Sequence, residues 1–461
     1  MSISNLLFTS RDALASNQMA IDITAGNIAN VNTPGYSTQR TDFKSVGSVN
    51  VSGASAQIGV TVSRIERLYD RFIESQIIDQ QQNTGYSDTL LQGLQNIEVM
   101  IDDTQGGGIS DQLSKFWSSW ENLSKNPGGI VERSALLSEA ENLTGSLASY
   151  KRNLDAITTD LSRGIADTVT QINEKVHEIK DLNTRIIETT GDSGDKNDFL
   201  DKRTQALKEL GALINITQFE NANGTVNAYL SNGEPLLQGT IEQPLSVKTN
   251  ADGQSDIYSS NLSGETVNSA LTRGKLGALI ELQGRIIPEY INYIETFTQS
   301  LADRVNDLHR DGFDAYNNTG LDFFEMSEAK NRAGTIRVNP TIAADVNRIA
   351  ASTAVTGNGE NASIIAAVQT ELLMNNHTSS LSSSLAATVG QIGQQVSMAK
   401  TNSDRQTVIA NHLNNQRESV SGVSIDEEMI RLIKYQMGYN AAGKLVTVVD
   451  EMLDTLMGLV K

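Results

Sequence analysis

The stretch "NIANVNTPGYSTQR", residues 27–40, sets the point at which the first helix of the chain must end. Proline lacks a backbone N–H and disfavours the helical conformation in the residue before it, so no helix continues through Pro34. Asparagine suits a helix end because it tolerates left-handed conformations and bonds nearby backbone. Three asparagines precede the proline, namely Asn27, Asn30 and Asn32. Pro34 and Gly35 fit the centre of a type II turn, so the stretch predicts a rigid corner that leads through Tyr36 into a strand.

The residues before the corner have the pattern of an amphipathic helix with a thin apolar seam. Apolar residues recur every seven positions, the spacing of a coiled coil, at Leu7, Leu14, Ile21 and Ile28. Polar residues occupy the alternate seam positions, at Ser10, Asn17 and Thr24. A helix with so few apolar residues is marginal alone and needs a partner.

The last forty residues carry a second stripe with the same spacing. Its members are Ile425, Leu432, Tyr439, Val446, Leu453 and Val460. Ser424 and Glu427 form an S-x-x-E capping box, which predicts the start of a long terminal helix. We expect the two terminal helices to pair with each other and then with neighbouring copies of the chain.

The sequence between the ends alternates helical and strand patterns. Helical spacing runs over 130–190, 275–309 and 379–420, with Gly164 and Pro288 as candidate interruptions. Asn-Gly pairs at 223–224 and 232–233 predict hairpins, and residues 36–65 also fit a hairpin. The fold class is therefore mainly α with β inserts, an elongated rod. We expect a terminal coiled-coil assembly domain with a β-hairpin (1–60 plus 405–461), a long helical rod domain (61–212 plus 270–404) and a small β insert domain (213–269).

Composition and motifs argue against several functions. A formal net charge of −19 disfavours binding to nucleic acid, and the absence of cysteine removes disulfides and thiolate chemistry. No window is apolar enough for a membrane span, and the start does not read as a secretory signal. Four scattered histidines lack ligand spacing, and the four aspartates of "GDSGDKNDFLD", residues 191–201, lack the order of a calcium loop. Phe116, Trp117 and Trp120 fit a helix core better than a membrane face. We expect no enzyme activity, cofactor or metal.

The corner and the last helix together resemble the flagellar axial proteins. "AGNIANVNTPGYSTQR" is similar to the N-terminal motif of rod, hook and hook-associated proteins, with Gly26 where asparagine is common. "SGVSIDEEMIRLIKYQMGYNAAGKLVTVVDEMLDTLM" is similar to their C-terminal signature. "GVTVSRIERLYDRFIESQI" and "NDFLDKRTQALKEL" resemble internal stretches of the hook-associated members at the hook–filament junction. Larger members carry a further inserted domain, for which the short link from Phe324 to Ile336 leaves no room.

The resemblance implies a structural subunit that joins the hook to the filament. It implies export by the flagellar type III system without a cleaved signal, and an extracellular position at the distal end of the hook. The implied partners are other copies of the chain, hook protein, a second hook-associated junction protein and an export chaperone on the C-terminal helix, but no nucleic acid and no membrane. The terminal stripes, the corner and the capping box would be the assembly residues. A hook or filament subunit is the nearest alternative, and a secreted coiled-coil adhesin is a more distant one.

Overall fold

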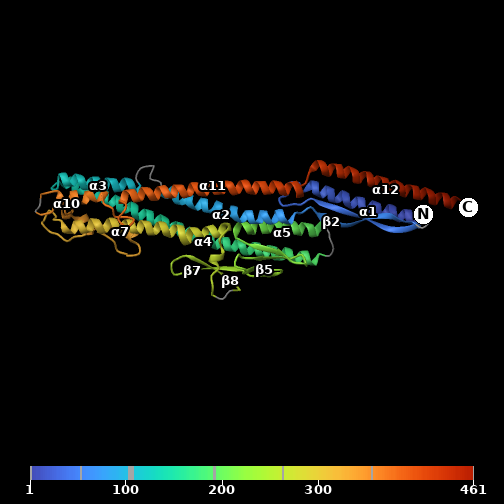
Figure 1. The fold of residues 1–461 in the computed structure, drawn as a ribbon, viewed down its shortest axis with the longest axis horizontal. Helices are drawn as coiled ribbons and strands as arrows, with labels where there is room; N and C mark the ends of the chain where they lie inside the picture. Colours follow the sequence, from blue (N-terminus) through green and yellow to red (C-terminus); the bar gives the residue numbers. More distant parts are fainter. Residues whose placement is uncertain are drawn as a thin grey trace.

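The computed structural model describes residues 3–51, 54–101, 108–189, 194–261, 264–354 and 357–459 as one elongated rod, and the two ends of the chain lie together at one end of it (Figure 1). The fold is mainly helical with small sheets, as the sequence predicts. The chain runs away from the terminal end, returns, and leaves a small β region on one side near the middle.

The terminal end of the rod consists of two helices and a hairpin. Helix α1 (Ile3–Ala29) pairs with α12 (Ile425–Leu459), and a two-stranded sheet of β1 (Gln39–Val51) and β2 (Ala54–Arg67) packs along α1. The strands are antiparallel, from Gln39 opposite Arg67 to Val51 opposite Ala54, with one irregularity between Asp42 and Phe43. The pairing of the terminal helices and the hairpin after the corner are therefore both present.

The rod is built from long helices that pack side by side. Helix α2 (Arg71–Ile101) lies against α11 (Leu381–Ser421) and α5 (Gly194–Leu213), and α4 (Ile130–Glu188) packs on α3 (Ile109–Lys125) and α5. At ~1.5 Å per residue, α4 is about 90 Å long. Gly164 does not interrupt it, because packing against the rod outweighs the weak helix propensity of one glycine.

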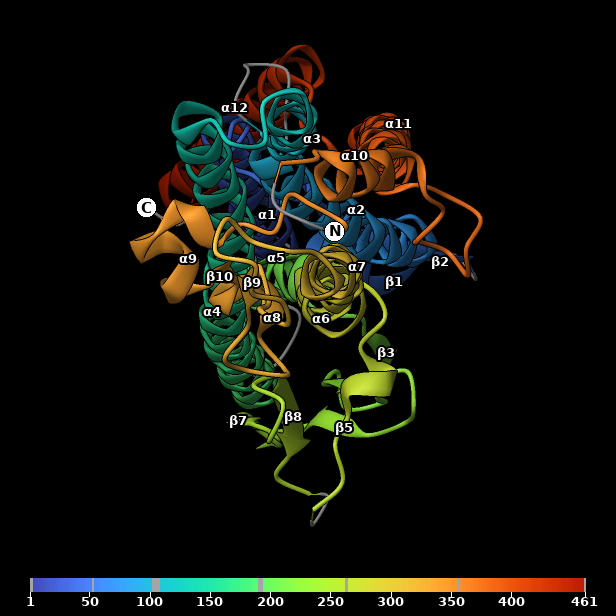
Figure 2. The same cartoon turned by 90° about the vertical axis from the view of Figure 1, so that its left-hand side faces the viewer.

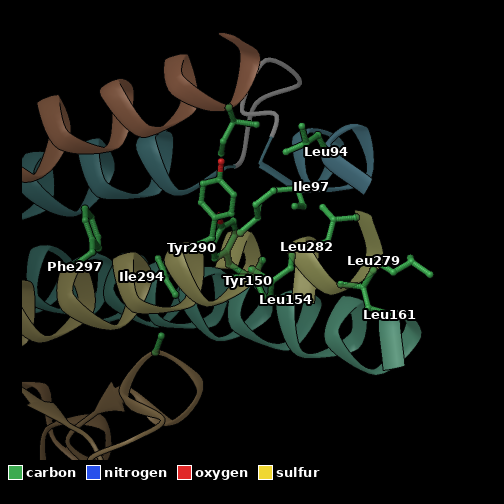
Figure 3. Close-up of a cluster of buried hydrophobic side chains, with 14 of the residues drawn as sticks. Leu94, Ile97, Tyr150, Leu154, Leu161, Leu279, Leu282, Tyr290, Ile294 and Phe297 are labelled. Atoms are coloured by element: carbon green, nitrogen blue, oxygen red, sulfur yellow. The ribbon is translucent and has the colours of Figure 1, made fainter. Parts of the chain in front are cut away.

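The core follows the apolar spacing of α4. Apolar residues at helical spacing are buried from Ala140 to Ile179, except for the half-buried Ile157, and they include three positions spaced by four at Leu161, Ile165 and Val169. Figure 3 shows Tyr150, Leu154 and Leu161 of α4 facing side chains from α2 and from the helical stretch 274–311. The facing residues are Leu94, Ile97, Leu279, Leu282, Tyr290, Ile294 and Phe297.

The helical pattern over 275–309 forms three consecutive pieces. These are α6 (Gly274–Glu281), a π-helical stretch η2 (Leu282–Ile286) and α7 (Ile287–Asp311). Pro288 stands in the first turn of α7, where the missing N–H is tolerated. The interruption expected near Pro288 is therefore a π-helical turn that leads into a new α-helix.

The end of the rod opposite the termini has an aromatic core. Phe116, Trp117 and Trp120 of α3 are fully buried against Phe323 and Phe324, so they belong to the core rather than to a membrane face. Short elements surround this core (Figure 2). They are β9 (Phe324–Glu325), α8 (Arg332–Thr335), β10 (Arg337–Val338), α9 (Pro340–Ala344), η3 (Val346–Arg348), α10 (Glu360–Ala367) and η4 (Val368–Thr370).

The β region between α5 and α6 contains two small antiparallel sheets. One has the order β3-β4-β5-β6, and the other pairs β7 with β8. Both Asn-Gly pairs lie in hairpin turns, where Gly224 and Gly233 have positive φ angles of 84° and 86°. The elements are β3 (Thr217–Glu220), β4 (Val226–Tyr229), β5 (Pro235–Gln238), β6 (Ile241–Glu242), β7 (Leu245–Thr249), β8 (Ser255–Ser259) and η1 (Asn268–Ala270).

The division into three domains remains a prediction. Helix α11 passes residue 405 without interruption, and the chain turns between Ser421 and Ile425. Strand β2 likewise continues past residue 60 to Arg67. We therefore propose that the terminal domain comprises residues 3–67 and 422–459.

Candidate assembly interface

The corner after α1 has the conformation that its proline and glycine predict. Helix α1 ends at Ala29, and the backbone N–H of Tyr36 donates to the carbonyl of Thr33 at 3.2 Å. Gly35 has a φ of 80°, the left-handed value that the third residue of a type II turn requires. The turn directs the next four residues into the junction between the terminal helices and the rod.

Asn27 connects four segments at this corner. Its amide nitrogen donates to the Gln39 carbonyl at 2.9 Å and to the Glu428 carboxylate at 2.8 Å. Its amide oxygen accepts from the Tyr36 hydroxyl at 2.9 Å and from the Gln39 N–H at 3.0 Å. The side chain is buried and all of these bonds are directional, so Asn27 fixes α1, the corner, β1 and the start of α12 relative to one another.

Asp201 of α5 holds the corner from the side of the rod. One carboxylate oxygen accepts from the Ser37 N–H and the other from the Ser37 hydroxyl, each at 2.9 Å. The second oxygen also accepts from the Arg67 guanidinium at 2.8 Å. Asp198, one turn earlier, accepts from the Gln39 amide at 3.0 Å. Two aspartates of the 191–201 cluster therefore anchor the corner; residues 191–193 of that stretch lie outside the described residues.

Thr38 and Arg417 close the corner against α11. The Thr38 N–H donates to the Ser421 carbonyl at 2.9 Å, and its hydroxyl donates to the Gly422 carbonyl at 2.8 Å. Arg417 donates to the Tyr36 carbonyl at 2.8 Å. The backbone of residues 36–39 is thus held by partners from α1, β2, α5 and α11. We call this arrangement, comprising residues 36–39, Asn27, Asp201 and Arg417, the polar socket.

The socket carries buried charge that shifts the pKa of its groups. Burial, followed by the Asp198, Asp201 and Glu428 carboxylates, raises the pKa of Tyr36 far above its ordinary value, so the hydroxyl stays a hydrogen-bond donor. Burial also raises the pKa of Asp201, against the opposing effect of Arg67 and the Ser37 hydrogen bonds. The arrangement orients chain segments through directional hydrogen bonds and buried charge.

Small and polar side chains fill the space between α1 and α12. The helices are antiparallel: Asn27 contacts Glu428, while a side chain added at Gly438 would meet Asn17. The buried residues of α1 are Ser10, Ser16, Ala20, Thr24 and Asn27, and of these Ser16 donates to the Val60 carbonyl of β2 at 3.2 Å and so faces the hairpin. Those of α12 are Glu428, Ala442 and Val449. The hydroxyls of Ser10 and Thr24 are satisfied by carbonyls of their own helix, so close packing of the pair leaves them bonded.

Many larger apolar side chains of α12 remain exposed in the isolated chain. Met437 is 67% exposed and Leu453 is 41% exposed. Further exposed apolar residues extend along the helix, at Ile425, Met429, Ile430, Ile433, Tyr439, Leu445, Val448, Met452, Leu456 and Met457. Exposed apolar surface of this extent marks a protein–protein contact. We call it the open face of α12.

The predicted assembly residues that the structure describes fall into four groups. Asn27, Asn30, Gly35 and Tyr36 belong to the corner, with Asn32 and Pro34 exposed on its outside. Five stripe residues are half-buried beside the seam, namely Leu14, Ile21, Ile28, Leu432 and Val446. Four others are exposed, namely Leu7, Ile425, Tyr439 and Leu453. Ser424 and Glu427 lie exposed at the start of α12, where the Glu427 N–H approaches the Ser424 hydroxyl at 3.5 Å. Val460 lies outside the described residues.

Sequence reasoning missed the charged residues Asp201 and Arg417 of the socket, and also Glu74 of α2, which accepts from Arg417 at 2.9 Å. Glu74, Arg417 and Asp201 occupy positions on buried helix faces, where unpaired charge is costly. The sequence does contain one sign of such residues. A charged residue at an apolar position of a helical pattern needs a partner once it is buried. The partner itself is set by tertiary packing and is not visible in the spacing.

Within the described ranges, no group of three or more His, Asp or Glu side chains is placed to hold a metal ion. The same residues include no helix that combines the length and the apolar character needed to cross a membrane. The chemical content of the site is therefore hydrogen bonding, buried charge and exposed apolar surface.

Protein-family patterns match both the rod and the terminal helices. The flagellar hook-associated protein FlgK helical domain matches residues 94–324, about half of the chain. The C-terminal region of the flagellar basal body rod FlgEFG proteins matches residues 415–459, and the flagella basal body rod protein pattern matches residues 7–36. The terminal matches contain Asn27, the corner, Arg417 and the open face of α12.

Full-length relatives extend these matches to the whole chain. Flagellar hook-associated protein 1 of Bacillus subtilis is 27% identical, over 98% of this chain and 97% of that protein. The protein of the same name from Salmonella typhimurium is 25% identical, over 99% of this chain and 100% of that one. The structure of the flagellar hook junction protein FlgK from Burkholderia pseudomallei matches with a TM-score of 0.67 at 14% identity, covering 75% of this chain and all of that one. This last similarity concerns the fold.

Proposed function

The chain belongs to the flagellar hook-associated protein FlgK family, and on that premise we infer that it is the structural subunit that joins the hook to the filament. The observation that carries this inference is the match to hook-associated protein 1 over nearly the whole length of both chains. The family is structural, and we propose that the chain acts without catalysis. Its place is the bacterial flagellum.

We propose that the terminal helices carry the assembly. The α1–α12 seam is filled from within the chain, which leaves the open face of α12 available for neighbouring subunits. Burying a Leu or Met side chain contributes about 1.5–3 kcal/mol, so even partial burial of this face would hold subunits together. The stripe residues Leu7, Ile425, Tyr439 and Leu453 would lie at these contacts.

The finer assignments follow from the same proposal. Copies of the chain form a ring or helical turn at the distal end of the hook, between hook protein and a second hook-associated junction protein. The chain leaves the cell through the flagellar type III system without a cleaved signal. An export chaperone that covers the open face of α12 before assembly would keep these apolar side chains out of water.

Imaging of a strain that lacks this chain tests the proposed role. Negative-stain electron microscopy should show cells with complete hooks and no filaments, and full-length filaments after complementation. Cells without hooks would indicate a hook subunit instead. Normal filaments in the deletion strain would refute the junction role.

A further inference from the structure

Arg417 lies one helical turn before α11 ends at Ser421, where the chain passes from the rod to the terminal helices. Its guanidinium uses three nitrogens for three partners. Nε donates to Glu74 of α2 at 2.9 Å, Nη2 donates to the Tyr36 carbonyl at 2.8 Å, and Nη1 contacts Glu418 at 2.6 Å. One side chain therefore bonds both the rod and the corner.

Glu74 belongs to a buried charge cluster. Its second carboxylate oxygen lies 2.7 Å from the Lys208 ammonium of α5. The Glu74 side chain is only 2% exposed and that of Arg417 only 6%. Burial lowers the pKa of Lys208, against the opposing effect of Glu74. The cluster is desolvated, so its bonds act with little screening by water or salt.

Buried ion clusters rarely add net stability relative to apolar packing, because desolvation offsets the attraction between the charges. Such clusters instead fix the relative orientation of the segments that they join. A hydrogen bond constrains both the distance and the angle between donor and acceptor, whereas apolar contacts do not. A charged cluster at the joint between two parts of a rod is therefore better explained by orientation than by stability.

We propose that Arg417 is a positioning residue that fixes the orientation of the terminal helices on the rod, through the Tyr36 carbonyl on one side and Glu74 on the other. Thr38 supports this joint by bonding the carbonyls of Ser421 and Gly422. Lysine cannot replace the arginine, because a single ammonium lacks the planar fork that reaches three separate acceptors. The consequence for assembly rests on the proposed function, whereas the orientation itself is a property of the isolated chain.

The test is the distance between two spin labels in the full-length chain, measured by pulsed electron paramagnetic resonance. The chain has no cysteine, so Thr170→Cys on α4 and Lys434→Cys on α12, both exposed, give two unique labelling sites. Arg417→Met and Arg417→Lys are compared with Arg405→Met, an exposed arginine of the same helix. Circular dichroism of each variant reports whether the rod stays folded.

We expect the unmodified chain and Arg405→Met to give one narrow distance distribution. Both Arg417 variants should give a distribution at least twofold broader with unchanged helical content. A distribution that is already broad in the unmodified chain, or one that stays narrow in Arg417→Lys, would overturn the proposal. If Arg417→Met loses helical content, the comparison rests on Arg417→Lys. If Arg417→Lys also loses helical content to the same extent as its distance distribution broadens, Arg417 has an ordinary structural role and the proposal is overturned. None of these outcomes bears on whether the chain joins hook to filament.

Discussion

Asn27 and Glu428 lie 401 positions apart in the sequence, and the Asn27 amide donates a 2.8 Å hydrogen bond to the Glu428 carboxylate. The bond joins the end of the first helix to the beginning of the last. It lies beside the corner, so the contact that pairs the terminal helices also belongs to the socket that attaches them to the rod.

Replacing Asn27 with alanine should destabilise the terminal domain. The Tyr36 hydroxyl, the Gln39 N–H and carbonyl, and Glu428 would all lose a partner. An unsatisfied buried group costs about 1–3 kcal/mol, so we expect a loss of at least about 2 kcal/mol in the free energy of unfolding, measured by denaturant titration. Asn32→Ala, an exposed asparagine of the same stretch, is the control and should change little. Equal effects would mean that the Asn27 bonds are not needed.

Gly35→Ala tests the conformation of the corner. A side chain in the left-handed region costs about 1–2 kcal/mol, and the new methyl group would lie 3.1 Å from the end of the flexible Gln205 side chain, which can move. We expect a loss of about 1 kcal/mol in stability and weaker swimming in soft agar. Gly26→Ala, in the last turns of α1 with open space around it, should be neutral or slightly stabilising. A neutral Gly35→Ala would show that the turn does not constrain the junction.

Leu453→Asp tests the open face of α12. Leu453 is 41% exposed, so a carboxylate there should leave the melting temperature of the isolated chain unchanged. In the assembly the same carboxylate would be desolvated without a partner, at a cost of several kcal/mol per contact. We expect normal export, cells with hooks but few filaments, and lost motility, while Asn440→Asp on the same helix should swim normally. Wild-type motility of Leu453→Asp, or an equally destabilised monomer, would contradict the assembly role of this face.

Limited proteolysis should remove the terminal helices before the rod. Helix α12 leaves a row of apolar residues exposed in the isolated chain and depends on neighbouring copies for burial, so it should open and be cut first. The socket buries Ser37, Thr38 and Gln39, and cleavage should stop on either side of it. Mass spectrometry of the fragments locates the cuts. Termini as resistant as the rod would contradict this expectation.

Stability should fall in mild acid because of His309. Its Nε2 accepts from the Ala350 N–H at 2.9 Å while Nδ1 faces the Leu321 carbonyl at 2.6 Å, so the ring is held neutral. Burial lowers its pKa from 6.5 to about 4, so the unfolded chain binds this proton more tightly than the folded chain. The neutral ring contributes about 3 kcal/mol to the free energy of unfolding above pH 6.5. This contribution is lost as the pH falls toward 4.

Denaturant titrations across this pH range check the assignment. His309→Gln should be less stable at pH 7 and should show a flatter decline between pH 6.5 and 4. His412→Gln, which replaces an exposed histidine of α11, is the matched control for the loss of a histidine side chain. An unchanged slope in His309→Gln would assign the acid sensitivity to other groups.

The sequence predicts those features of the fold that follow from local spacing. The helix expected over 130–190 and the corner at Pro34 are both present, because helical spacing and proline act through neighbouring residues. The terminal stripes are less informative, since a seven-residue repeat does not distinguish a contact within the chain from one between chains. In the structure Ser10 and Thr24 are buried while Leu453 is 41% exposed.

The polar socket could not be predicted in this way. Glu74, Asp201 and Arg417 are scattered over three helices, and their meeting depends on how α2, α5 and α11 pack. Each reads in sequence as an isolated charge on a helix. Only the fold shows that Asp201 and Arg417 bind residues 36–39 and that Glu74 binds Arg417.

Labelling of an introduced cysteine before and after assembly tests the central claim most directly. Met437→Cys lies on the open face of α12 and should react with a maleimide in the isolated chain, where Met437 is 67% exposed. In purified hook–filament particles the same cysteine should be protected at least tenfold, while Asp252→Cys, at an exposed turn of the β region, should react in both states. Equal labelling of Met437→Cys in the isolated chain and in the particles, with Asp252→Cys reactive in both, would contradict assembly through the terminal helices.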